Sequence, residues 1–76
     1  MTMAFVMINT VPGQRETVLD TVKKIDFVTE AHLLDKEYDI VAVVKTEADA
    51  DFPQTLLRIR TTEGASDVIF LQTLEE

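Results

Sequence analysis

The sequence predicts an α+β domain with the ferredoxin-like order strand, helix, strand, strand, helix, strand. Two observations lead to this fold. Four short apolar segments alternate with two segments in which apolar residues recur at helical spacing. The two middle apolar segments are joined by only three polar residues, 35–37, a connection of hairpin length. Crossovers within one sheet are almost always right-handed, so both helices should cover one face of a four-stranded antiparallel sheet.

The first strand is expected at residues 4–8, because the run AFVMI is followed by the turn-forming triplet VPG. A helix is expected over residues 14–25. Its apolar positions follow the spacing i, i+1, i+4, i+7 and form one stripe: Val18, Leu19, Val22 and Ile25.

Residues 27–34 are expected to form an edge strand, because their side chains alternate weakly in polarity. One side of this strand would carry Phe27, Thr29, Ala31 and Leu33. The other side would carry Val28, Glu30, His32 and Leu34. Charged side chains on an edge strand deter unwanted pairing with other strands.

The third strand is expected at residues 38–45 and contains five consecutive apolar residues. Successive side chains of a strand point to opposite faces. Ile40, Ala42 and Val44 therefore share one face, while Val41 and Val43 share the other. In this topology the first and third strands are central, and they are the most continuously apolar ones.

The second helix should start close to Pro53, since proline fits only in the first turn of a helix. Asp49 or Asp51 is expected to cap its free N–H groups. An apolar stripe follows, made of Phe52, Leu56 and Ile59. After Gly64, residues 67–74 are expected to form the fourth strand.

This arrangement leaves one apolar sheet face without helices over it. Soluble monomers rarely expose an apolar patch larger than roughly 300–600 Å². An identical face in a two-fold dimer is the most economical partner, so Val41 and Val43 are predicted to lie in a dimer interface. The alternative is that these positions hold β-branched residues only for their strand propensity.

Size and composition exclude several classes of protein. The 76 residues, with a formal charge of −7, predict one domain over residues 1–76 that gains stability from a partner subunit. The absence of cysteine and the presence of one histidine exclude disulfides and multi-histidine metal sites within a chain. The seven Lys and Arg residues are scattered, so direct nucleic-acid binding is not expected. No segment has the length of a signal-peptide core or a membrane span, which predicts a cytoplasmic protein away from membranes.

No catalytic constellation is visible in the sequence, and no cofactor is expected. His32 has no cysteine to activate and no evident serine partner, and there is no glycine-rich phosphate loop. Glu30 and His32 would bind a metal only across a two-fold axis, and a solvated histidine is the simpler interpretation. The acidic run 47–51 lacks the spacing of a calcium loop and is interpreted as a solvated, capping segment.

Three features resemble the effector domain of the Lrp/AsnC transcription regulators, called the RAM domain (regulation of amino acid metabolism). They are the VPG turn, the stretch EYDIVAVV and the glycine before the last strand. The pair Tyr38 and Asp39 is the most specific of them. The resemblance spans about residues 4–74. In the family this domain follows a helix-turn-helix domain, which this sequence lacks, so the chain resembles a stand-alone RAM domain.

The resemblance implies dimers joined through their sheets, often assembled into rings, that bind free amino acids between subunits. It implies a ligand site formed by Lys36, Glu37, Tyr38 and Asp39, with Ser66, Val68 and Phe70 on its other side.

Within this implied site, Asp39 would accept the ligand's ammonium group, or would instead be a turn residue that bonds nearby backbone N–H groups. Tyr38 would line the pocket, or would be an ordinary strand aromatic residue. Lys36 stands where the family usually has glycine, and Val68 and Phe70 replace hydroxyl residues.

Three functions are therefore expected, in order of preference. The first is an amino-acid-binding and oligomerisation module that acts in regulation of amino acid metabolism or transcription. The second is a purely structural oligomerisation partner of full-length Lrp/AsnC regulators. The third is a small dimeric α+β barrel enzyme, which would need polar residues on the helix-free face of the sheet.

Overall fold

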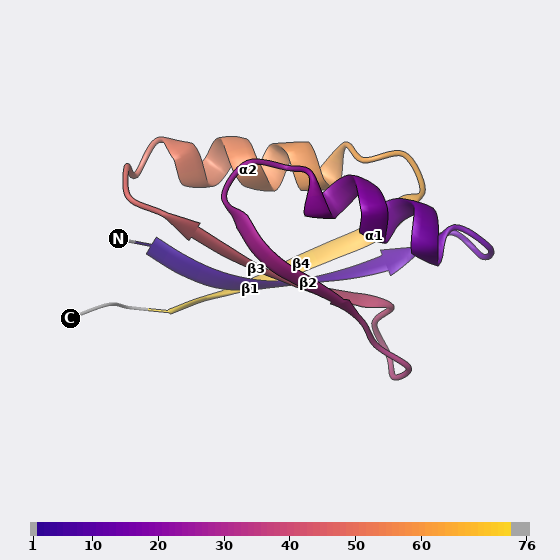
Figure 1. The fold of residues 1–76 in the computed structure, drawn as a ribbon. Helices are drawn as coiled ribbons and strands as arrows, with labels where there is room; N and C mark the ends of the chain where they lie inside the picture. The colour runs from indigo at the N-terminus through magenta and orange to yellow at the C-terminus, as the bar shows by residue number, and fades with distance from the viewer. Residues whose placement is uncertain (1, 74–76) are drawn as a thin grey trace.

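The computed structural model describes residues 2–73 and has the predicted element order (Figure 1). The strands are β1 (Thr2–Thr10), β2 (Val28–Leu33), β3 (Ile40–Thr46) and β4 (Ala65–Thr73), and the helices are α1 (Arg15–Lys23) and α2 (Asp51–Arg60). The strands pair antiparallel in the order β2-β3-β1-β4, so β1 and β3 are central. The ferredoxin-like prediction is confirmed. Leu74, the predicted end of the fourth strand, lies outside the described residues.

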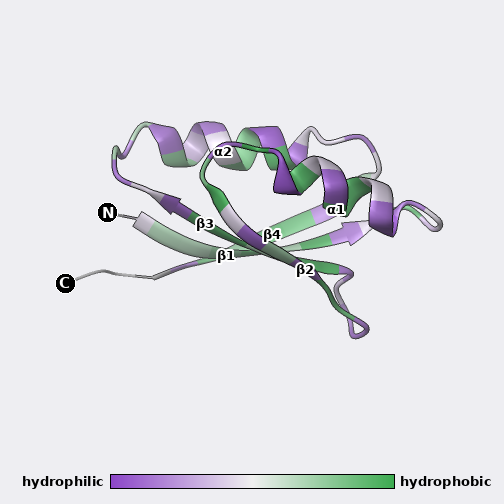
Figure 2. Cartoon of the chain, viewed as in Figure 1, coloured by the Kyte–Doolittle hydropathy of each residue, from purple (hydrophilic) through white to green (hydrophobic). Residues whose placement is uncertain are grey.

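Both helices lie on the same face of the sheet, which we call the covered face (Figure 1). Figure 2 shows that each helix is hydrophilic on its outer side and that the strands beneath are mostly hydrophobic. The buried core joins both helices to alternate residues of the strands: Ala4, Val6, Ile8, Val18, Val22, Ala31, Ile40, Ala42, Val44, Phe52, Leu56 and Ile59. Among the helices of residues 2–73, none is long and apolar enough to cross a membrane.

The predicted division of β3 into two faces is confirmed. Ile40, Ala42 and Val44 are fully buried beneath the helices. Val41 and Val43 are half-buried and lie on the opposite, helix-free face. Alternation therefore holds along the whole of this central strand.

The faces predicted for β2 are wrong at its start. Val28 pairs with Val44, but Glu30 already pairs with Val43, so an extra residue is inserted at a β-bulge. The bulge turns Val28 toward the core, on the same face as Ala31. Glu30 and His32 share the helix-free face, so this part of the predicted grouping holds.

The predicted cap of α2 is also wrong. The N-cap residue is Ala50, and no side chain caps the helix there. Instead, the backbone N–H groups of Asp51 and Phe52 donate to the carbonyls of Ala48 and Asp49. Pro53 has no N–H, so the first turn needs no carboxylate cap.

Gly64 allows the chain to return closely over α1. Its φ is +95°, and a Cβ atom there would lie 2.8 Å from a methyl group of Val18. Its carbonyl accepts a hydrogen bond from the N–H of Val11 at 2.8 Å. This contact holds the start of β4 against the end of β1.

Candidate functional site

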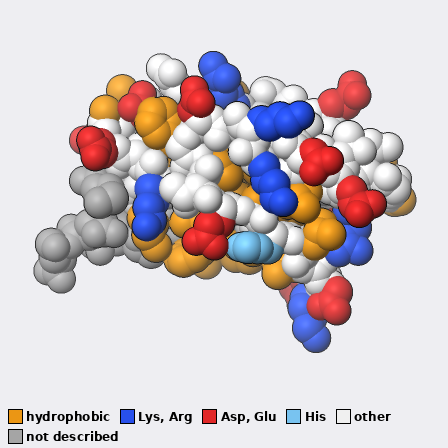
Figure 3. All heavy atoms as spheres, viewed as in Figure 1, with side chains coloured by type: hydrophobic (Ala, Val, Ile, Leu, Met, Phe, Trp, Pro, Cys, Tyr) orange, Lys and Arg blue, Asp and Glu red, His pale blue; other side chains and the backbone are white. Residues whose placement is uncertain are grey.

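The helix-free face of the sheet is apolar along its centre. Its side chains come from β1, β3 and β4: Met3, Phe5, Met7, Val41, Val43, Ile69 and Leu71. Phe5 is 38% exposed and Leu71 is 57% exposed. Figure 3 shows hydrophobic side chains along the lower edge of the molecule, on the side away from the helices. This surface is the one for which the sequence predicted a partner.

Polar side chains on β2 border this face. Nε2 of His32 lies 3.1 Å from Oε1 of Glu30, and both side chains are exposed. Within residues 2–73, no group of three His, Cys, Asp or Glu side chains is placed to hold a metal ion.

The loop between β2 and β3 extends beyond the sheet toward the helix-free side (Figure 1). A hollow of about 580 Å³ lies between this loop and the sheet, lined by Met7, Leu34, Lys36, Glu37 and Tyr38. It brings together Lys36, Glu37 and Tyr38, all of which the sequence analysis assigned to a ligand site. Met7 and Leu34 were missed, because their contact with the loop depends on strand register rather than on any local pattern.

Lys36 does not strain the loop in the place of the family's usual glycine. Phe27 is the one non-glycine residue with positive φ in residues 2–73. Lys36 therefore adopts an ordinary backbone conformation, which side chains tolerate freely. Its flexible side chain lines the hollow instead.

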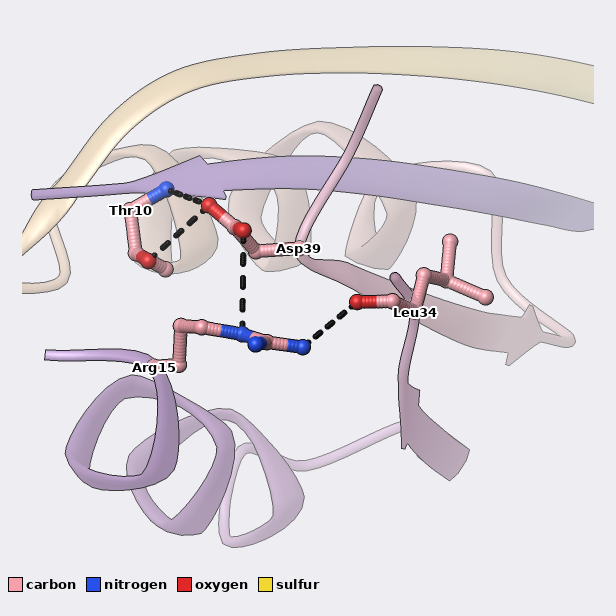
Figure 4. Close-up of polar contacts among 4 residues, drawn as sticks. All are labelled: Thr10, Arg15, Leu34 and Asp39. Carbon is pink, nitrogen blue, oxygen red and sulfur yellow. Dashed lines mark hydrogen bonds and ion pairs between the residues drawn. The ribbon is translucent and has the colours of Figure 1, made fainter. Parts of the chain in front are cut away.

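Asp39 lies at the base of the same loop, and its carboxylate is engaged within the protein (Figure 4). Its Oδ2 atom accepts hydrogen bonds from the backbone N–H of Thr10 at 2.8 Å and from the Thr10 hydroxyl at 3.0 Å. Its Oδ1 atom lies 3.7 Å from Nε of Arg15. The structure thus shows a backbone-bonded Asp39, although the N–H belongs to a distant strand rather than to the turn. The ligand contact predicted for this carboxylate stays a prediction.

This environment lowers the pKa of Asp39 below its ordinary value of 3.8. The main cause is the hydrogen bond from the Thr10 N–H, which stabilises the charged carboxylate. The Thr10 hydroxyl and the Arg15 charge act in the same direction, while desolvation opposes them.

The remaining predicted site residues lie on β4, two strands from β3, or about 10 Å across the sheet. Ser66 is exposed at an irregularity where β4 leaves its register with β1. Val68 and Phe70 lie on the covered face and pack against the core, and the Phe70 ring meets the Phe52 ring edge-on at 5.7 Å. Within one protomer the structure does not bring them to the hollow, so their ligand role stays a prediction.

Comparison with solved structures finds the same fold in bacterial and archaeal proteins. The hypothetical protein PHS023 from Pyrococcus horikoshii superposes with a TM-score of 0.91 at 25% identity, over 100% of this chain and 93% of that one. The protein TTHA0845 from Thermus thermophilus gives a TM-score of 0.90 at 21% identity, over 100% of this chain and 96% of that one.

A longer protein contains the same fold as a part. The transcriptional regulator NMB0573 from Neisseria meningitidis, solved as a complex with L-Met, gives a TM-score of 0.84 at 20% identity. The match covers 99% of this chain but 51% of the regulator.

Family comparison agrees with the structural one. No curated protein is similar enough in sequence to count as a match. The family model of the Lrp/AsnC ligand binding domain matches residues 3–75, which is nearly the whole chain. The chain therefore belongs to the Lrp/AsnC ligand-binding domain family.

Proposed function

We propose that this domain binds a free amino acid in the hollow beside the loop 34–38 and serves as a regulatory effector-binding module. The observation that carries this proposal is the composition of the hollow. One wall is apolar, and the loop adds a cation and a carboxylate within three residues. Its volume of about 580 Å³ is in the usual range of small-molecule sites.

Each part of an amino acid has a suitable group in the hollow. Lys36 provides an ammonium group for the ligand's carboxylate. Glu37 in the hollow, or Asp39 at the base of the loop, provides a carboxylate for the ligand's ammonium. Met7, Leu34 and Tyr38 offer an apolar surface to the side chain. We therefore expect leucine, isoleucine, methionine or phenylalanine to bind better than glutamine.

A dimer would place this hollow at a subunit junction. Met7 belongs both to the hollow and to the helix-free face, so a partner packed on that face would border the bound ligand. We propose a two-fold dimer in which Val41 and Val43 lie in the interface, with rings of dimers as the next level of assembly. In such an assembly, the exposed Ser66 of a neighbouring subunit would border the site, whereas Val68 and Phe70 pack against their own core.

The relatives support the ligand class. The Neisseria regulator was solved as an L-Met complex, and it shares this fold over nearly all of the present chain. Membership of a ligand-binding family supports an effector role and does not favour an enzyme.

Isothermal titration of the purified protein with the twenty amino acids tests the proposal. We expect weak binding by apolar amino acids. Glu37→Gln and Lys36→Gln should each weaken it by roughly tenfold, because each removes a charge-assisted hydrogen bond. Lys24→Gln is the matched control, since Lys24 is an exposed lysine at the far end of α1.

The absence of heat with every amino acid at millimolar concentration would contradict the proposal. Equal loss in the Lys24→Gln control would show a general charge effect and no site at the loop.

A second candidate function is structural. Because the same fold occupies about half of the Neisseria regulator, this chain could pair with the corresponding domain of a full-length regulator. Mixing the chain with such a regulator and measuring the mass by light scattering tests this. A species of intermediate mass, with no amino acid bound, would favour this candidate over the first.

We expect no direct binding to duplex DNA, since seven scattered cations in a chain of net charge −7 form no basic patch. The proposed role is in the cytoplasm, through another protein. A salt-dependent gel shift with the purified chain would contradict it.

A further inference from the structure

We infer that Thr10, Arg15 and Asp39 form a clamp that holds the loop 34–38 in position. Asp39 then affects ligand binding only by positioning the loop, and Glu37 is the residue that binds the ligand's ammonium. This inference rests on the proposed amino-acid site and assigns the roles within it. It also identifies Thr10 and Arg15 as positioning residues, which no sequence pattern indicated.

The clamp closes the loop at both of its ends (Figure 4). At the first end, the N–H of Leu34 donates to the carbonyl of Asp39 at 2.8 Å. The carbonyl of Leu34 accepts a hydrogen bond from Nη2 of Arg15. At the second end, the N–H of Asp39 donates to the carbonyl of Ile8 at 3.0 Å. The residues between these ends carry all the charged side chains of the hollow.

The three clamp residues come from separate parts of the fold. Thr10 ends β1, Arg15 begins α1, and Asp39 immediately precedes β3. The Arg15 guanidinium spans the gap, since one nitrogen faces the Asp39 carboxylate and another reaches the Leu34 carbonyl. The geometry thus ties the base of the loop to a helix and two strands at once.

The Asp39 carboxylate has little left to offer a ligand. Oδ2 already accepts two hydrogen bonds from Thr10, and Oδ1 faces Arg15. An ammonium group could approach only Oδ1, and there the Arg15 guanidinium, 3.7 Å away, would repel its like charge. Glu37, by contrast, is exposed and lines the hollow. The ligand's cation therefore has an accessible carboxylate only two residues away from the engaged one.

Two measurements on the full chain separate positioning from contact. The first is amide hydrogen exchange of residues 34–38 without ligand, with the exchange of β3 as reference. The second is isothermal titration with methionine. Thr10→Val removes one hydrogen bond of the clamp, Arg15→Gln removes the charge, and Thr10→Ser keeps the hydroxyl. Glu37→Gln leaves the clamp intact.

We expect Thr10→Val and Arg15→Gln to raise loop exchange about two- to tenfold, as the loss of one hydrogen bond does, and to weaken binding by a similar factor. Exchange of β3 should stay constant. Thr10→Ser, which keeps the hydroxyl, should have the loop exchange and the methionine affinity of the unmodified chain. Glu37→Gln should weaken binding with unchanged loop exchange.

The inference is overturned if Thr10→Val and Arg15→Gln leave loop exchange as in the unmodified chain. It is also overturned if Asp39→Ala abolishes binding while loop exchange stays constant, because Asp39 would then contact the ligand directly. If the unmodified chain binds no amino acid, the proposed function fails, and the exchange measurement alone still decides whether the clamp orders the loop.

Discussion

The two faces of the sheet are built from the same strands and are both apolar, but only one of them is covered within the chain. On the covered face, Val6 and Val44 are fully buried within one protomer. On the helix-free face, Val43 is half-buried and Phe5 remains 38% exposed. The covered face is completed by the chain itself, whereas the helix-free face lacks a cover among residues 2–73.

Within β3, alternate residues therefore have two different roles, one in folding and one in assembly. Side chains on the covered face stabilise the fold, because burial removes their apolar surface from water. Side chains on the helix-free face, such as the half-buried Val43, contribute less to the isolated fold and keep apolar surface available for assembly. Neighbouring residues of β3 should therefore respond to the same substitution in different ways.

The largest effect is expected for Val44→Asp. Val44 is fully buried in the core, and a carboxylate there would have no charged partner. An unpaired buried charge costs several kcal/mol, which is comparable to the whole stability of a small domain. We expect the variant to lack the far-UV circular dichroism of the native chain. A cooperatively unfolding Val44→Asp variant would show that the covered face is less critical than its burial indicates.

The same substitution one residue away should break assembly and spare the fold. Val43→Asp would place a carboxylate in the proposed interface twice, once per protomer. We expect a folded monomer by light scattering, and Val41→Asp should behave likewise. Leu57→Asp is the control, because Leu57 is 61% exposed on α2 and should leave the dimer intact. A monomeric unmodified chain would refute the proposed interface.

The third effect concerns Asp39, at the base of the loop between β2 and β3. The pKa of Asp39 is lower in the folded chain than the ordinary 3.8, so its carboxylate favours folding above that value. This contribution disappears as the pH falls through the folded pKa. We expect the stability difference between the unmodified chain and Asp39→Asn to shrink between pH 5 and pH 2. Urea titrations at one fixed protein concentration measure it, and a difference that stays constant would contradict the assignment.

The central strands could be predicted from the sequence because their structure is regular. A period of two placed Ile40 and Val41 on opposite faces, and a period near 3.6 placed the stripe of α2. The β2 faces could not be predicted, since a bulge inserts a residue between Val28 and Glu30 with no local sequence signal.

The candidate site was predictable only in part. Lys36 and Tyr38 followed from a resemblance, and the structure brings both to one hollow. The partner of Asp39 could not be found in the sequence, because Thr10 is 29 residues away. Met7 could not be assigned to the site from the sequence, because its position beside the loop depends on the pairing of β1 with β3.

A smaller effect is expected at a polar residue of the covered face. The hydroxyl of Thr46 is buried and finds no hydrogen-bond partner among the described residues. Thr46→Val should stabilise the chain by about 1 kcal/mol, because it removes an unsatisfied polar group from the core. Thr55→Val is the matched control, since the Thr55 hydroxyl donates to the carbonyl of Asp51 at 2.8 Å and its loss should destabilise. Equal effects of the two substitutions in urea titrations would contradict this reasoning.

The smallest effect is expected at the turn that precedes β2 and its bulge. Phe27 precedes the bulge and has a φ of +74°, which is unusual for a bulky residue. Its carbonyl accepts a hydrogen bond from the N–H of Lys45 at 3.0 Å, so the turn fixes the start of β2 against β3.

At such a position, glycine should be better tolerated than alanine. Both Phe27→Gly and Phe27→Ala remove the ring, but only alanine retains a Cβ in the left-handed region. We expect Phe27→Gly to be more stable than Phe27→Ala by up to about 1 kcal/mol. On α2, Leu57→Gly and Leu57→Ala should show the usual reverse order, because glycine weakens a helix by about the same amount. Urea titrations of the four variants measure both differences. The same order at both positions would mean that the turn relaxes when the ring is removed, and that the bulge alone sets the faces of β2.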